Sequence, residues 1–485
     1  IYYPSLLAGY LNMDYKKLLE NFSVAIISQG VGFILSAITA LIVPKVLGIT
    51  EYGYWQLFIF YTSYTGFFHL GLNDGFYLLK SGQTRNSLDE RDLKSQFSFC
   101  AVLQLCVAIG IVICAMLFPL EEERQFIICL TAIFLILNNT SLFLGFSFQA
   151  LNETKLYSYS VMIDKILFLI PLSVLLVSGN TDFKPYVVFY VASKTCSLVY
   201  CLVKAKDLLR EKPYTARESI KRSFMSIKVG IVLMLSGIAG SLILGIARFV
   251  IDYKWGINAF GEVSLALSIM TFFLAFISQA SMVLFPALKH SEKKESLDMY
   301  SPIRDISGLA FSSIYLFYYP VAFVVGLWLP QYSNSLVWLA IFLPACVFDG
   351  KMNLCSTTYF KVIRKEKIML GINFGAMSAS IFFSLFAAFV INSITAVIFT
   401  AVIAIILRAV ISEKYLERRL PSSRGKLVYS EIALAVAFIC LVYLAGDNYI
   451  AGETISCILY LAFLIINKSI SFPYFKKILT RKIKN

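Results

Sequence analysis

The chain consists of one apolar stretch after another, and each stretch is long enough to cross a lipid bilayer. About 20 apolar residues in helical conformation span the hydrocarbon core. We identify fourteen such segments, at 22–44, 54–79, 96–118, 125–150, 157–178, 185–203, 226–250, 258–288, 306–329, 336–360, 369–389, 394–411, 428–445 and 449–467. Only 15% of the residues are charged, against about a quarter in soluble proteins. The sequence therefore predicts an all-α polytopic membrane protein with about 14 transmembrane helices.

The positive charge is concentrated in alternate loops. Most of the 43 lysines and arginines lie at one set of helix ends. The opposite ends hold Lys45, Arg124, Lys184, Arg248 and Lys254. This asymmetry is the positive-inside pattern of membrane proteins. It predicts that both termini are cytoplasmic, and it explains the net charge of +14 without a nucleic-acid partner.

A short motif occurs twice. Residues 48–53 and 256–261 share the pattern Gly-Ile-x-x-aromatic-Gly, and each copy follows one apolar segment and opens another. The glycines allow a tight turn between helices. The copies lie six spans apart, so a duplication would be parallel, with two lobes of six spans each and a substrate site near the midplane between them.

This duplication sets the expected domain boundaries. They are an N-terminal cytoplasmic segment (1–20), an N-lobe (21–203), a basic cytoplasmic linker (204–225), a C-lobe (226–411), and two further spans with a basic cytoplasmic tail (412–485). The chain begins with Ile1, and Met13 is a more natural start, so we leave 1–12 out of the fold prediction.

No motif for catalysis or metal binding is found. All ten cysteines fall in apolar segments without zinc or redox spacing, which is typical of buried small side chains. The two histidines, His69 and His290, belong to no triad or metal pattern. The sequence therefore predicts a protein that is not an enzyme and has no cofactor.

Ionisable residues deep in the apolar segments are the first candidates for function. They are Lys194 in the sixth segment, Asp349 and Lys351 in the tenth, and Asp164 and Lys165 in the fifth. Each charge at the bilayer centre costs about 2.5–3.5 kcal/mol, so these side chains should face a wet cavity or one another. No partner for Lys194 is evident nearby. Lys165 has a second interpretation, because its side chain could reach the cytoplasmic interface.

Two further features point to a polar substrate. Arg248 lies near the outer end of the seventh segment, where it is either a substrate contact or an interfacial anchor. The second segment is unusually polar and aromatic, with Tyr61, Tyr64, His69 and Asp74. Aromatic rings with a polar group stack on sugars. An interfacial aromatic belt would explain Tyr54 and Trp55 of the same segment, but not Tyr61 and Tyr64, which lie deeper.

Several stretches resemble the polysaccharide-repeat-unit flippases of O-antigen and capsule synthesis, in the multidrug/oligosaccharidyl-lipid/polysaccharide exporter superfamily. These stretches are Pro44-Lys45-Val46-Leu47-Gly48, Glu51-Tyr52-Gly53-Tyr54-Trp55, Leu70-Gly71-Leu72-Asn73-Asp74-Gly75 and Ala247-Arg248-Phe249-Val250. Family members often carry Asp before this arginine, where this chain has Ala247.

The resemblance implies a flippase that moves an undecaprenyl-diphosphate-linked oligosaccharide from the inner to the outer leaflet by alternating access. Such a protein would lie in the bacterial inner membrane, where a polysaccharide polymerase and the chain-length machinery would be possible partners. The diphosphate needs cationic partners. The expected electrostatic lining is Arg248, Lys194, Lys351 and Lys165, the expected sugar contacts are His69, Tyr61 and Tyr64, and the candidates for H⁺ or Na⁺ coupling are Asp349, Asp164 and Asp74.

Two other functions remain open. A cation-coupled drug antiporter of the same superfamily would favour twelve spans and an acidic site. A glycan polymerase or ligase would need a large outer loop, whereas every expected outer loop here is short. A major-facilitator transporter would carry a Gly-x-x-x-Asp-Arg-x-Gly-Arg-Arg loop, which is absent after the second segment.

Overall fold

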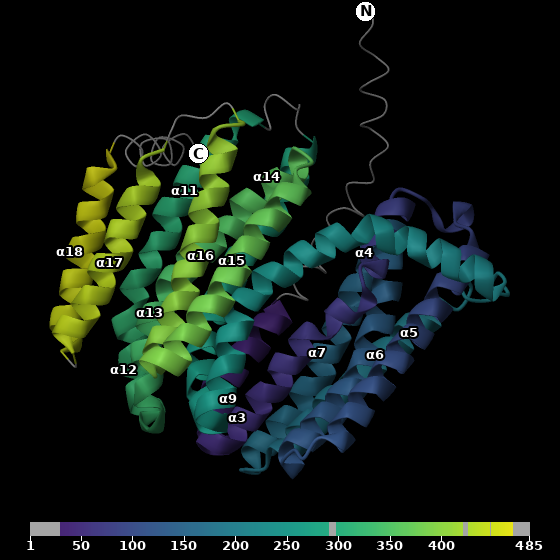
Figure 1. Ribbon diagram of the computed structural model, residues 1–485, viewed down its shortest axis with the longest axis horizontal. Helices are drawn as coiled ribbons and strands as arrows, with labels where there is room; N and C mark the ends of the chain where they lie inside the picture. The colour runs from purple at the N-terminus through teal and green to yellow at the C-terminus, as the bar shows by residue number, and fades with distance from the viewer. Residues whose placement is uncertain (1–29, 291–296, 421–424, 447, 469–485) are drawn as a thin grey trace, which may run out of the picture. The chain divides into compact units, whose positions relative to one another are not determined.

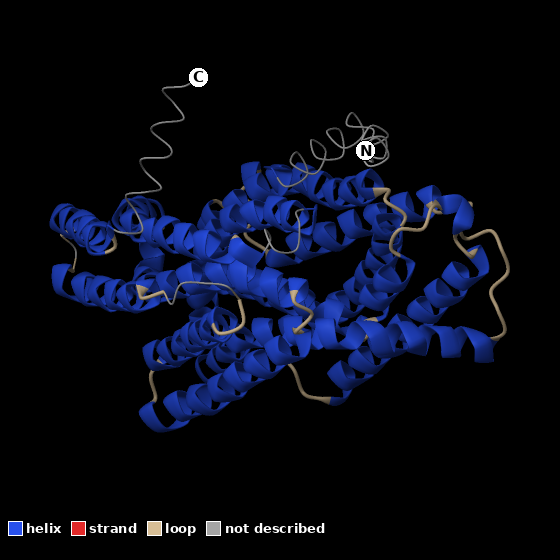
Figure 2. Cartoon of the chain, turned by 90° about the horizontal axis from the view of Figure 1, so that it is seen from above, coloured by secondary structure: helices blue, strands red, loops and turns tan. Residues whose placement is uncertain are grey.

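The computed structural model describes residues 30–290, 297–420, 425–446 and 448–468, with the side chains of 276–290 excepted. Within these ranges the chain forms helices and connecting loops, and no strand (Figure 2). The expected N-terminal segment 1–20 lies outside the described residues, as do the alternative start at Met13 and residues 469–485 of the basic tail.

The helices follow the apolar segments closely in the first part of the chain (Figure 1). After a helix at Gly30–Leu41, the elements are α3 (Val43–Tyr64), η1 (Thr65–His69), α4 (Leu72–Lys80), η2 (Arg85–Ser87), α5 (Glu90–Leu117), α6 (Glu122–Ala150), α7 (Thr154–Val177) and α8 (Phe183–Lys204). The second predicted span is thus built from α3, η1 and α4, with a break in its middle.

The second part of the chain contains more interruptions. Its elements are α9 (Ala216–His290), α11 (Tyr300–Ser312), η3 (Ser313–Phe317), α12 (Tyr318–Trp328), η4 (Pro330–Tyr332), α13 (Ser333–Lys351), η5 (Met352–Ser356), α14 (Thr357–Val362), α15 (Glu366–Phe386), η6 (Ala387–Ile391), α16 (Ile394–Glu417), α17 (Leu427–Ala445) and α18 (Tyr449–Ile466). Both η5 and η6 are π-helical turns. The predicted ninth span is interrupted by the 3-10 turn η3, and the tenth and eleventh contain the π turns.

Eleven helices in the described part of the chain are long and apolar enough to cross a membrane, and the bent pair Gly30–Leu41 and Val43–His69 makes a twelfth. This count includes α9 as a single helix. Its 75 residues would measure about 110 Å if straight, against about 30 Å for the hydrocarbon core, so α9 holds two predicted spans. The all-α polytopic class is confirmed.

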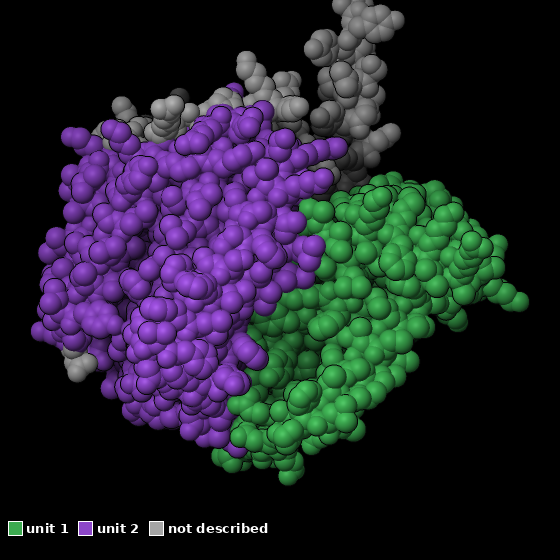
Figure 3. Space-filling view, in the orientation of Figure 1, with its two compact units in different colours: residues 1–38, 54–234 green, residues 39–53, 235–485 purple. Residues whose placement is uncertain are grey.

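The chain divides into two compact units (Figure 3). The described residues of the first unit are 30–38 and 54–234, and those of the second are 39–53, 235–290, 297–420, 425–446 and 448–468. The predicted linker 204–225 falls within the first unit. The short stretch 39–53, which carries the first copy of the duplicated motif, groups with the second copy.

The first glycine of each motif makes the turn. Gly48 has φ 72° and ψ −177°, and Gly256 has φ 80° and ψ −174°. This region of backbone space is open essentially to glycine alone. The two copies therefore break their helices with the same backbone geometry, which confirms the predicted turns.

The second glycine of each motif serves close packing instead. A Cβ atom added to Gly53 would lie 2.6 Å from the carbonyl oxygen of Ile257, and one added to Gly261 would lie 3.0 Å from that of Ile49. These two contacts are equivalent, because Gly53 and Gly261 occupy the same position in their motifs, and so do Ile49 and Ile257. Thr50 Oγ1 donates to Asn258 Oδ1 at 2.9 Å, and these two residues are themselves 208 apart. The copies thus cross each other about a local two-fold axis.

Aromatic side chains form much of the core of the first unit. Trp55 is 1% exposed, and its ring lies 5.8 Å from the rings of both Phe168 and Tyr190. Phe58 contacts Tyr190 edge to face at 5.7 Å. Interpreting Trp55 as part of an interfacial belt was wrong, because it packs inside the helix bundle against α7 and α8.

The cysteines divide by environment. Cys100, Cys201, Cys346 and Cys355 are buried as predicted, whereas Cys106, Cys114, Cys196 and Cys440 are exposed on helices. For these four the prediction of burial within the protein was wrong. They lie in helices predicted to cross the membrane, where lipid can surround an apolar side chain as protein does.

Candidate functional site

The deep lysines of the first unit gather around one carboxylate. Lys194 of α8 places Nζ 3.1 Å from Asp164 Oδ2 of α7. The partner that the sequence did not reveal lies on the neighbouring helix. Asp164 Oδ1 is buried and accepts no hydrogen bond within the described residues.

Lys165 adds a second positive charge to this cluster. The Lys165 side chain runs against Gly32, where an added Cβ would lie 3.4 Å from Cδ and in closer contact with Nζ. Glycine at position 32 therefore makes room for the lysine ammonium. We call Asp164, Lys165 and Lys194 the lysine cluster. With two ammonium groups and one carboxylate, it carries a net positive charge when ionised.

The break in the second span brings together another group of polar residues. Helix α3 ends at Tyr64, and the chain passes through η1 and two left-handed residues, Leu70 and Gly71, before α4 begins. A broken helix frees backbone groups that must find partners inside a membrane protein. Discontinuous helices of this kind often border substrate or ion sites in transporters.

Buried amide side chains form hydrogen bonds with backbone carbonyl groups at this break. Asn139 of α6 donates to the carbonyl oxygen of Thr65 at 2.8 Å and to Gln104 Oε1 at 2.7 Å. Gln104 donates in turn to the carbonyl oxygen of Phe68 at 3.0 Å. We call these residues, together with Asn138 and Asn73, the amide network. It holds the 3-10 turn in a fixed geometry without using a charge.

His69 ends that turn and is buried. Its Nδ1 accepts a hydrogen bond from the backbone N–H of Gly71 at 3.0 Å, so in the neutral ring Nε2 carries the proton. Nε2 lies 3.8 Å from Asp74 Oδ2, which is longer than a direct hydrogen bond. Two of the predicted residues are therefore brought together at the break.

The predicted tyrosines lie one to two turns before the break. Phe60 contacts the rings of both Tyr61 and Tyr64, at 5.7 and 5.0 Å, and Tyr64 also contacts Phe67 at 5.3 Å. Both tyrosines are only partly buried. They can present a polar edge together with an aromatic face.

Arg248 lies next to the second duplicated motif. Its guanidinium donates to Ser264 Oγ at 2.9 Å and lies 4.8 Å from the ring centre of Phe260. Asp252, one helical turn further along α9, is buried. Arg248, which precedes the Gly256 break, is thus held by two residues that follow it.

In the second unit each of the two predicted charges has its own partners. Asp349 pairs with Arg408 of α16, and Asn353 donates to its other oxygen at 3.1 Å. Lys351 donates to Glu413 at 3.0 Å and to the two oxygens of Glu431 at 2.9 and 2.7 Å. The prediction that Asp349 and Lys351 do not neutralise each other is confirmed.

Four further buried charged residues, Glu413, Glu431, Arg304 and Glu417, were not among the predicted site residues. All four are buried, yet Arg304, Glu413 and Glu417 lie between the predicted segments, in stretches that the charge pattern assigns to cytoplasmic loops. A usable signal was present in Glu431, which opens the apolar segment of α17 as a carboxylate among leucine, valine and alanine. Its depth becomes apparent only when the partner helices are in place.

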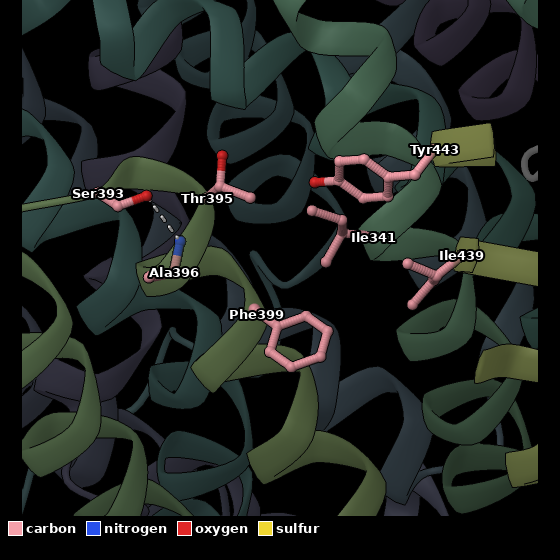
Figure 4. A pocket seen from close by; sticks show the side chains of 7 residues that line it. All are labelled: Ile341, Ser393, Thr395, Ala396, Phe399, Ile439 and Tyr443. Carbon is pink, nitrogen blue, oxygen red and sulfur yellow. Dashed lines mark hydrogen bonds between the residues drawn. The ribbon is translucent and has the colours of Figure 1, made fainter. Parts of the chain in front are cut away.

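A separate pocket of about 350 Å³ lies in the second unit (Figure 4). Its walls come from α13, α16 and α17, with Tyr443, Ile341 and Phe399 around one space. The other lining residues are Ser393, Thr395, Ala396 and Ile439. None of the predicted site residues lines it. Its surface is mainly apolar, so it suits a hydrocarbon group better than a sugar or a diphosphate.

The fold is that of flippases and multidrug transporters. The structure of the lipid II flippase MurJ in an inward closed conformation superposes with a TM-score of 0.66 at 12% identity, over 93% of this chain and 99% of that one. An inward-facing multidrug resistance MATE family transporter of the MOP superfamily gives 0.55 at 14% identity, over 81% and 98%. A MATE structure in complex with MaD3S gives 0.52 at 13% identity, over 83% and 96%.

The sequence itself identifies the family. Residues 18–292 match the family model described as polysaccharide biosynthesis protein, which is more than half of the chain. The protein belongs to this family of membrane proteins. No curated protein sequence matches the chain.

Proposed function

We propose that this protein is a flippase for a lipid-linked oligosaccharide. It would move an undecaprenyl-diphosphate-linked repeat unit from the inner to the outer leaflet of the bacterial cytoplasmic membrane by alternating access, for synthesis of a surface polysaccharide such as O-antigen or capsule. Its family is one of polysaccharide biosynthesis, and its fold resembles that of a lipid II flippase. A polysaccharide polymerase and chain-length machinery are the partners that this role would require.

The lysine cluster carries the proposal. A diphosphate is bound best by charge-assisted hydrogen bonds, and the cluster offers two ammonium groups against a single carboxylate. Asp164 holds Lys194 at 3.1 Å, which would keep that ammonium in place while no substrate is bound. The diphosphate would then bind Lys165 first and compete with Asp164 for Lys194.

The remaining expected residues take different parts in this proposal. Arg248 is a further cationic contact, and Tyr61, Tyr64 and His69 would contact sugars. Lys351 is left out, because its three N–H groups already donate to carboxylate oxygens. Asp164, Asp74 and Asp349 stay as candidates for coupling to H⁺ or Na⁺.

The test is deletion of the gene followed by analysis of lipid-linked glycans in each leaflet. We expect complete diphosphate-linked repeat units to accumulate on the cytoplasmic side and surface polymer to disappear. If single repeat units reach the outer leaflet but are never joined, the protein is a polymerase. If neither pool changes, a drug antiporter becomes the better description.

Complementation with variants tests the lysine cluster. Lys165→Gln and Lys194→Gln should each lower flipping about 10- to 100-fold, because each removes a charged hydrogen bond of about 1.5–3 kcal/mol. Lys204→Gln, at the exposed end of the same helix α8, is the matched control and should flip at the normal rate. Normal flipping by both cluster variants would contradict the role proposed for these lysines.

A further inference from the structure

Three helices of the second unit meet around a buried ammonium group. Lys351 of α13 contacts Glu413 of α16 at 3.0 Å and Glu431 of α17 at 2.7 Å. All three residues are at least 95% buried. We call them the carboxylate triad. It joins α17, which follows the duplicated spans, to two helices of the second lobe.

The charges in the triad do not balance. One ammonium group faces two carboxylates, and all three of its hydrogens are used. Glu413 Oε1 accepts no hydrogen bond within the described part of the chain. The nearest other cation is Arg304, whose Nε lies 3.9 Å from this oxygen.

Arg304 is engaged elsewhere. Its guanidinium bonds to Asp305 and to Glu417, each at 2.7 Å, so it adds two carboxylates along with its one charge. A buried carboxylate without full compensation costs several kcal/mol. A single proton placed on the triad would remove this cost.

The groups that face Glu413 and Glu431 come from every neighbouring element. They are Lys351 on α13, Cys355 on η5, Tyr300, Arg304 and Asp305 on α11, and Tyr315 on η3. Glu417 and Lys414 on α16 lie one ion pair further away, beyond Arg304. When Glu413 and Glu431 are counted together with these groups, carboxylates outnumber cations. The surroundings therefore do not cancel the excess negative charge of the triad.

We propose that the carboxylate triad is a proton-binding site, in which Glu413 and Glu431 share one exchangeable proton around Lys351. The step adds H⁺ to a carboxylate to give a carboxylic acid and requires no other reactant. If the protein is a flippase as proposed above, this proton is the coupling ion. None of the three aspartates suggested by sequence belongs to this site.

Proton uptake would loosen one helix contact. Protonating Glu431 replaces its ion pair with Lys351 by a hydrogen bond from the ammonium group to a neutral carboxyl, which is weaker in a buried site. That ion pair is the charged link between α13 and α17. Binding of the proton would therefore allow α17 to move more freely relative to α13.

Polar side chains connect the triad to the exposed end of α16. Lys414 is 28% exposed at its side chain and pairs with Glu417 at 2.9 Å. Glu417 contacts Arg304, which faces Glu413. A chain of polar groups thus joins the triad to the end of the helix.

The experiment is an infrared titration of the purified full-length protein in detergent. A protonated buried carboxyl gives a C=O stretching band that shifts in D₂O. We expect this band to grow as the pH falls from alkaline to mildly acidic values. If the wild-type protein shows no titrating carboxyl band, the proposal is overturned without the use of any variant.

Variants then locate the proton. Glu413→Gln should remove the imbalance and the band, and Glu431→Gln should do the same. Lys351→Met should shift the band to higher pH, because loss of the cation disfavours the ionised carboxylates. Glu218→Gln, which changes a partly exposed carboxylate on α9, is the control and should titrate as wild type. A band that persists unchanged in both glutamate variants would contradict the assignment.

Transport assays separate this proposal from the proposed function. In proteoliposomes, a pH gradient should drive flipping by the wild type, whereas Glu413→Gln should flip equally with and without the gradient. If the wild type does not flip a lipid-linked oligosaccharide, the flippase proposal fails while the infrared result still decides the proton site. Gradient-driven flipping by Glu413→Gln would overturn the coupling role alone.

Discussion

The amide network of the first unit and the carboxylate triad of the second each include residues of two corresponding helices, α6 and α13, but their chemistry differs. Asn138 and Asp349 occupy the same position, counted from the first residues of α6 and α13. Asn139 follows the first of these and Lys351 lies just after the second. One half of a duplicated architecture thus has neutral amides where the other half has charges.

The difference suggests separate tasks for the two halves. An amide cannot change its charge with pH, so the hydrogen bonds of the amide network to the broken second span do not depend on pH. A carboxylate can gain or lose a proton, so the triad can respond to pH. Both sites provide hydrogen-bond partners for polar groups that are buried away from water. Only the triad contains groups that can change their charge with pH.

The largest expected effect follows from breaking the triad. Lys351→Met leaves Glu413 and Glu431 buried without their cation, which should cost about 3–5 kcal/mol of stability. Thermal unfolding in detergent measures this loss. The double variant Lys351→Met with Glu431→Gln should recover part of it. Equal stability of Lys351→Met and wild type would show that the triad is not held by charge.

Substitution of the first glycine in either copy of the motif should lower the stability of the protein by the same amount. Gly48→Ala and Gly256→Ala each place a side chain in a region of backbone space that costs about 1–3 kcal/mol. No neighbouring atom lies within 4 Å of either added Cβ, so the loss comes from the backbone alone. Gly237→Ala, in a regular helix with equally open surroundings, is the control and should be neutral or slightly stabilising. Unequal losses would mean that the two copies are not structurally equivalent.

The amide network should be less costly to break than the triad. Asn139→Leu leaves the carbonyl oxygen of Thr65 and Gln104 Oε1 without their donor, at about 1–3 kcal/mol. Asn138→Leu removes only one contact, of 3.3 Å to the Thr65 hydroxyl, and should cost less. Comparison of their unfolding temperatures checks the order. A larger loss for Asn138→Leu would place the centre of the network elsewhere.

The smallest effect is expected at the loop contact outside the membrane. Arg85 bonds Glu153 at 2.8 Å and Asp207 at 2.5 Å, and the hydrogen bond from Arg85 lowers the pKa of Asp207. Its contribution to stability is therefore present above the ordinary aspartate pKa and is lost as the pH falls into the acid range. Arg85→Gln should cost less than about 1 kcal/mol.

The pH dependence of unfolding distinguishes this contact from the buried sites. In Arg85→Gln the acid-dependent part of the stability should be reduced, whereas Lys204→Gln, a nearby exposed control, should keep it. An unchanged acid profile in Arg85→Gln would mean that the contact with Asp207 does not stabilise the fold.

The sequence was a good guide to features that depend on neighbouring residues. The apolar segments predicted the helices because burial of about 20 residues in a membrane is a local property. The two turns were predicted because their backbone conformation demands glycine at one position. Part of the candidate site was also accessible, since a charge within an apolar segment stands out by itself.

The sequence did not predict which side chains contact each other between helices that lie far apart in the chain. Asp164 and Lys194 are thirty residues apart and come from different helices, and Glu431 is eighty residues from Lys351. Trp55 was misplaced for the same reason, because its aromatic neighbours belong to α7 and α8.

The sequence alone determined that this chain forms many apolar helices, each long enough to cross a membrane, and that its turn motif is duplicated. These properties follow from hydrophobicity and backbone sterics, which act within a few residues. The tertiary structure alone decided which charges are compensated, since that depends on distances between helices. The lysine cluster keeps an excess ammonium and the carboxylate triad an excess carboxylate only because of how α7, α8, α13, α16 and α17 pack.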